Sequence, residues 1–152
     1  MTDINKTAGN PDDPPRIDGE GLAVINNLKD LKQYWYICIN TKGLPNSLKY
    51  SDMEEISRNL LNCYGYLYRA NKRGAINVSR KKKGLPALYR PYDILQDARA
   101  AESEFTLAEG KMEIVIENPA LKLRKSELDK RRGAVARTMR GWLIYLQQTQ
   151  SR

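Results

Sequence analysis

The feature of this sequence that most restricts its fold is a run of apolar residues at helical spacing between residues 118 and 148. Six residues of this run fall at intervals of seven and four: Leu121, Leu128, Val135, Met139, Trp142 and Leu146. All six share one face of a helix about 45 Å long, and we call this face the apolar seam. Asn118 and Pro119 suit the start of such a helix, because Asn caps well and Pro fits the first helical position.

The other faces of this predicted helix are strongly basic, with two acidic residues, Glu127 and Asp129, against eight basic ones: Lys122, Arg124, Lys125, Lys130, Arg131, Arg132, Arg137 and Arg140. A long helix with one narrow seam needs a partner for the seam and counterions for its charges. This favours a helical, oligomerising protein that binds a polyanion over an enzyme.

The charge of the whole chain points in the same direction. The formal net charge is +8, although residues 1–20 carry five acidic and only two basic residues. A basic body with a sparse acidic arm is typical of nucleic-acid binding, because each neutralised phosphate releases condensed counterions. A basic but inert surface is the alternative.

Several classes of function are disfavoured. The chain has no histidine and only two cysteines, Cys38 and Cys63, which fall in apolar helical patterns and are expected to be free, buried thiols. We therefore expect no metal site, cofactor or catalytic residue, and the common nucleotide and nucleophile motifs are absent. No apolar run approaches about 18 residues, so we expect no membrane partner and a cytoplasmic location.

The N-terminal part is predicted to hold a flexible acidic arm over residues 1–20 and a pair of helices within residues 21–73. Apolar residues at steps of four and three predict the first helix over residues 21–40. Ser51, with Glu54 three residues later, matches a capping box for a second helix that runs to about Lys72.

Residues 74–90 are predicted to be a basic linker, because Gly74, Gly84 and Pro86 disfavour regular helix there. Basic side chains in and just before this linker are our candidate nucleic-acid contacts: Arg69, Lys72, Arg73, Arg80, Lys81, Lys82, Lys83 and Arg90. A solvated linker without a ligand is the alternative.

Residues 91–148 are predicted to form a helix, a β-hairpin over residues 105–116 and the long helix, followed by a polar tail over residues 149–152. A lone hairpin is marginal in water, so joined hairpins from several copies would be more stable. The hairpin and the seam supply the predicted oligomerisation residues: Met112, Ile114, Ile116, Leu121, Leu128, Val135, Met139, Trp142 and Leu146.

The order of these features resembles the small terminase subunits of tailed phages. The resemblance lies in Tyr34-Trp35 at the end of the first helix, the segment over residues 48–55, Leu60-Leu-Asn-Cys-Tyr64, and Glu117-Asn-Pro-Ala-Leu121 before a long basic helix. It covers residues 22–72 and 92–146 loosely. The sequence shows no clear helix-turn-helix, because the connection over residues 41–50 is too long for a tight turn.

This resemblance implies a non-catalytic DNA-packaging component that forms a closed homo-oligomeric ring, binds double-stranded viral DNA and delivers it to the large terminase subunit, an ATPase and nuclease. The location would be the host cell cytoplasm. The expected fold is mainly α, a helical bundle with a long C-terminal helix and a small β-hairpin. A heterologous interface that closes gives a ring and an isologous one a dimer. The alternatives are a dimeric DNA-binding transcriptional regulator of a phage or mobile element, and an inhibitor module that binds an acidic protein surface.

Overall fold

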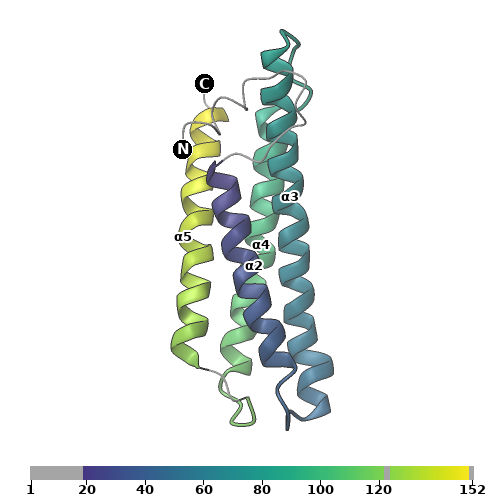
Figure 1. The fold of residues 1–152 in the computed structure, drawn as a ribbon, viewed down its shortest axis with the longest axis vertical. Coiled ribbons are helices and arrows are strands. Elements are labelled where there is room, and N and C mark those ends of the chain that lie inside the picture. The colour runs from purple at the N-terminus through teal and green to yellow at the C-terminus, as the bar shows by residue number, and fades with distance from the viewer. Residues whose placement is uncertain (1–18, 122–123, 151–152) are drawn as a thin grey trace, which may run out of the picture.

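Four long helices make up most of the chain in the computed structural model, which describes residues 19–121 and 124–150 (Figure 1). Their bounds are α2 Gly19–Ile39, α3 Glu54–Lys82, α4 Pro91–Val115 and α5 Lys125–Gln150. A short π-helical segment, η1 (Leu48–Met53), leads directly into α3. The described part of the chain contains no strand, so the prediction of a mainly α fold is confirmed.

The helices lie side by side and alternate in direction along the bundle (Figure 1). α2 packs on α3 and α5, and α4 packs on the same two helices from the other side. Buried apolar residues from all four helices form one core. The segments predicted separately as residues 21–73 and 91–148 therefore fold against each other.

The apolar seam is covered within the chain, and five of its six residues lie on α5, whereas Leu121 precedes that helix and is buried there at 7% exposure. Leu128 and Val135 are fully buried, and Met139 and Trp142 are each only 2% exposed. Because α5 packs between α2 and α4, these side chains fill the space between three helices of one molecule. The prediction of a shared apolar face is correct, but the face does not need a second chain to cover it.

The predicted β-hairpin is wrong, because residues 105–115 belong to α4. Phe105, Ala108, Met112 and Val115 are buried at spacings of three and four residues, which is the period of a helix. Ile114 was assigned to the same strand face as Met112, yet it is 76% exposed. Among the nine residues predicted for oligomerisation it is the only one that the structure leaves at the surface.

The predicted helix start at Asn118 is also wrong, because α5 begins at Lys125. The Asn118 side chain instead accepts a hydrogen bond from the backbone N–H of Ala120 at 2.9 Å, which stabilises a turn after α4. Asn favours such turns as strongly as it favours helix caps, so the local signal has two meanings.

Helical structure extends past both ends of the predicted second helix, through η1 before α3 and through the last ten residues of α3. Ser51 is not an N-cap: it lies inside η1, and its hydroxyl donates to the carbonyl of Ser47. α3 then continues through Gly74 to Lys82, so the predicted linker over residues 74–90 is a connection of residues 83–90 only. Burial of Ala70, Asn71 and Ala75 extends the helical stripe past Gly74 and outweighs the propensity of glycine.

The first helix agrees with its prediction, except that it begins two residues earlier, at Gly19, within the predicted arm. α2 matches the helix predicted over residues 21–40, and its Trp35 is buried with its indole N–H donating to the carbonyl of Met53 at 3.2 Å. Both cysteines are free and buried, as expected. Residues 1–18 of the predicted acidic arm lie outside the described residues.

Substitutions on α5 can test whether the apolar seam is part of the core of a single chain. Met139→Ala should lower the free energy of unfolding by about 2–5 kcal/mol, because it leaves a cavity between α5 and its neighbours. Ile144→Ala, on the same helix but 48% exposed, is the matched control and should change it by less than about 0.5 kcal/mol. Urea denaturation followed by circular dichroism measures both, and equal losses would contradict this packing.

Candidate nucleic-acid interface

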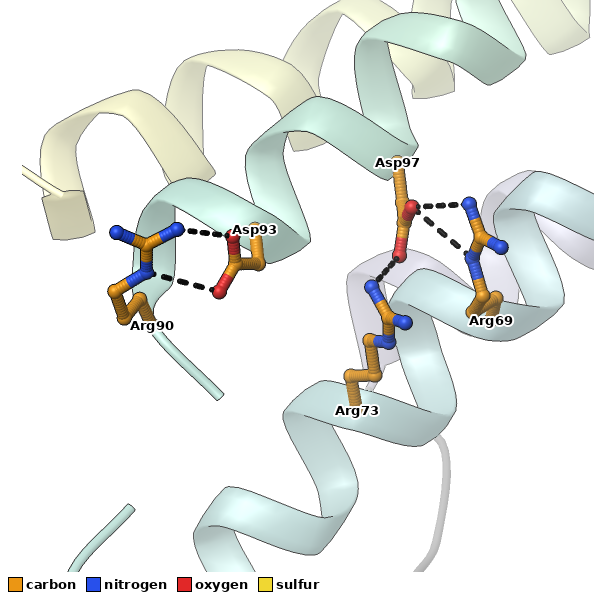
Figure 2. Close-up of polar contacts among 5 residues, drawn as sticks. All are labelled: Arg69, Arg73, Arg90, Asp93 and Asp97. Carbon is orange, nitrogen blue, oxygen red and sulfur yellow. Dashed lines mark hydrogen bonds and ion pairs between the residues drawn. The ribbon is translucent and has the colours of Figure 1, made fainter. Parts of the chain in front are cut away.

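Two of the predicted phosphate-binding arginines are held by an aspartate of the neighbouring helix (Figure 2). Arg69 donates to Asp97 Oδ1 from Nη2 at 2.7 Å and from Nε at 3.0 Å, and Arg73 Nη1 donates to Oδ2 at 2.9 Å. Asp97 lies on α4 and is only 4% exposed. The hydrogen bond that Arg69 donates to Asp97 raises the pKa of Arg69. These two arginines join α3 to α4.

A third predicted arginine, Arg90, is paired locally. Its Nη2 lies 2.9 Å from Asp93 Oδ1 and its Nε 3.1 Å from Oδ2, across the first turn of α4 (Figure 2). This hydrogen-bonded pair lowers the pKa of Asp93 and raises that of Arg90. Residues 69–90 contain no acidic residue, so the sequence of this segment alone does not reveal the carboxylates of Asp93 and Asp97, which follow it in α4.

The C-terminal end of α3 is capped by the backbone of the residues that follow it. The backbone N–H of Leu85 donates to Arg80 O and that of Gly84 to Lys81 O, which is the Schellman arrangement, and Gly84 has the positive φ of 74° that this motif requires. Asn77 then fastens the following loop to α3: its Oδ1 accepts from the N–H groups of Leu88 and Tyr89. The loop therefore holds a defined shape.

This cap presents a group of lysines that we call the basic tip: Lys81, Lys82 and Lys83. All three are exposed, and the end of α3 that carries them projects beyond the other helices (Figure 1). The adjacent Arg80 is less available, because its Nε donates to the carbonyl of Pro86 at 2.7 Å. The structure thus separates the eight predicted cations into four arginines tied to the fold, the half-exposed Lys72 and the three exposed lysines of the basic tip.

A second group of lysines lies over tyrosine rings between α2 and α3. The ammonium groups of Lys29 and Lys32 are 5.9 and 4.9 Å from the ring centre of Tyr64, and Lys72 is 5.7 Å from that of Tyr68. The two rings stack with centres 6.2 Å apart. Within the described residues, no carboxylate lies within ion-pair distance of these three lysines.

Sequence reasoning missed this second group except for Lys72. Lys29 and Lys32 lie outside the basic stretch over residues 69–90 from which the candidate contacts were taken. Their spacing of three residues on a helix was the available signal, because it puts both ammonium groups on one face.

The two cysteine thiols are buried and protonated, which makes them poor nucleophiles. Burial raises the pKa of the Cys63 thiol to about 12, and burial also raises that of Cys38, so both thiols stay protonated near neutral pH. Among the residues that the structure describes, no three Cys, Asp or Glu side chains gather closely enough to hold a metal ion. None of the described helices is long and apolar enough to cross a membrane.

Comparison of the chain with protein families, with curated proteins and with solved structures finds no match in any of the three. The function therefore has to be argued from the residues themselves.

The structural role of Asp97 can be tested against that of Asp93. Asp97→Asn should lower the free energy of unfolding by about 1–2 kcal/mol, because the guanidinium groups of Arg69 and Arg73 lose a buried, charged hydrogen-bond acceptor. The expected loss is modest because the Arg69 side chain is half-exposed and solvent screens its charge. Asp93→Asn breaks an exposed pair and should have little effect. Thermal and urea unfolding compare the two variants; equal stability would contradict a role for Asp97 in joining α3 to α4.

Proposed function

We propose that this protein binds double-stranded DNA non-catalytically along the outer edge of α3, through Lys72 and the basic tip. The proposal rests on how the predicted basic residues are distributed. The arginines form hydrogen bonds to carboxylates or to the loop after α3, whereas the lysines of the basic tip are exposed at the projecting end of that helix. Hydrated lysines on a projecting end are suited to a phosphate backbone, since they can reach it without burying charge.

The geometry of α3 supports Lys72 and Lys83 as two points of one contact. They are eleven residues apart, about three turns, so they lie on one side of the helix, whereas Lys81 lies on the opposite side from Lys72. From Lys72 to Lys83 the helix rises about 16 Å, roughly the axial rise of five base pairs. Such contacts fix position on DNA without reading its sequence.

The more specific form of the proposal is the role of a viral DNA-packaging component, a small terminase subunit. It includes a large ATPase–nuclease subunit and further copies of this chain as partners, and the host cytoplasm as location. Support for it is the resemblance described above together with the basic, helical chain. Because the seam is filled within one chain, assembly into a ring would have to use the outer faces of the bundle.

DNA binding is tested by removing the charge of the basic tip. The triple variant Lys81→Gln, Lys82→Gln and Lys83→Gln should weaken binding to a labelled duplex and lower the slope of log K against log salt by roughly three, about one for each lost phosphate contact. Fluorescence anisotropy over a salt series measures both quantities.

The matched control removes three charges from α5, in the variant Lys130→Gln, Arg137→Gln and Arg140→Gln. These residues are exposed and far from the tip in sequence. If both variants lose the same affinity, net charge rather than the edge of α3 governs binding. If only the α5 variant loses it, the contact surface lies on α5.

The packaging role makes a separate prediction about mass. Light scattering of the full chain, with and without DNA, should give an assembly of many copies if the packaging role is correct, because that role requires a ring. A dimer with a two-fold DNA footprint would favour a transcriptional regulator. A monomer at micromolar concentration would contradict the ring and leave DNA binding by α3 to be judged on its own.

A further inference from the structure

A groove of about 560 Å³ runs between α2 and α3, away from the basic tip. Its floor includes Trp35 and Leu60, each 1% exposed, and its rim includes Tyr36 and Ile37, which are 69% and 65% exposed. The indole N–H of Trp35 is already bonded to Met53 O, so the indole adds no free polar group to the floor. The groove is therefore an apolar surface that the folded chain leaves open.

The rim of the groove is positively charged. Lys29 and Lys32 line it, and neither forms an ion pair with a described carboxylate. The nearest acidic residue in sequence, Asp30, points to the other side of α2, where it lies 3.6 Å from Arg131 of α5. A ligand that fits this groove must combine apolar side chains with negative charge.

We infer that the groove binds an amphipathic helix of another protein, with apolar side chains on the floor and acidic side chains against Lys29 and Lys32. Both walls are helices whose backbone groups are bonded internally, so an extended peptide would find no backbone partners there. A helix brings its own backbone bonds with it. From Lys29 to Ile37 the wall rises about 12 Å, which accommodates roughly two turns of such a partner.

Other occupants fit less well. A second copy packed through the same surface in an isologous interface would bring Lys29 and Lys32 against their own counterparts, and like charges repel. A phosphate backbone would gain nothing from the apolar floor. The inference does not depend on DNA binding by α3, because it rests on different residues.

The test uses the full chain and three labelled peptides. The first is a designed helix with leucines at positions i, i+3 and i+7 and glutamates on both flanks; the second replaces the glutamates by lysines; the third is residues 1–18 of this chain. Fluorescence anisotropy should show binding of the glutamate peptide, at least about tenfold tighter than the lysine peptide.

Variants connect this binding to the groove. Ile37→Glu should weaken binding of the glutamate peptide about tenfold or more, whereas Ile114→Glu, which changes another exposed isoleucine on α4, should not. Lys29→Glu with Lys32→Glu should reverse the preference between the two designed peptides. DNA affinity should be unchanged by Ile37→Glu, so failure here is distinguishable from failure of the proposed function.

Several results would overturn the inference. Equal binding of the glutamate and lysine peptides, or equal effects of Ile37→Glu and Ile114→Glu, would show that the peptides bind without using the groove. Binding of the residue 1–18 peptide alone would make the chain's own arm the occupant. Displacement of the peptide by duplex DNA, with loss of DNA binding in Ile37→Glu, would assign the groove to nucleic acid.

Discussion

Burial of the apolar face of α5 between α2 and α4 is the interaction on which the rest of the bundle depends. Without α5, the core side of α2 would have only α3 to pack against, and a two-helix contact leaves much of each apolar face in water. Polar contacts then fix the alignment of the two helices: Asn27 Nδ2 lies 3.4 Å from Ala134 O and 3.3 Å from Thr138 Oγ1. The buried apolar core determines which helices pack together, and these weaker polar contacts determine how α2 and α5 are aligned along their axes.

The same packing decides which charges remain for a ligand. When α4 lies along α3, Asp97 meets Arg69 and Arg73, and a basic stretch of sequence becomes partly neutral. The lysines of the basic tip, at the end of α3, are exposed. A count of basic residues along the chain therefore overstates the charge available at the middle of α3 and indicates correctly only its exposed end.

Periodicity in the sequence was sufficient to predict α2 and the buried face of α5, because a helical stripe of Leu, Val and Trp has few other solutions. It could not identify what covers that face, since a seam looks the same whether its partner is another chain or another segment. Local signals were less reliable: Ser51, Gly74 and Asn118 each matched a common boundary motif, yet Ser51 lies inside η1, Gly74 inside α3 and Asn118 in a turn after α4. Ion pairs between helices, such as Arg69 with Asp97, depend on the packing and have no signature in one segment.

The basic edge and the groove also differ in how they discriminate among ligands. The edge has charge without an apolar floor, so any polyanion of suitable shape satisfies it, whereas the groove demands apolar side chains as well. The two sites meet at the stacked tyrosines, because Lys72 lies over Tyr68 while Lys29 and Lys32 on the groove rim lie over Tyr64. The basic tip is farther away: from Leu60 to Lys82 α3 rises about 33 Å, well beyond the screening length of about 8 Å at physiological salt. An acidic helix in the groove would therefore weaken the attraction of phosphate to Lys72 more than to the tip. On these two proposals, α3 would contribute to a nucleic-acid contact at its end and to a protein contact in the groove.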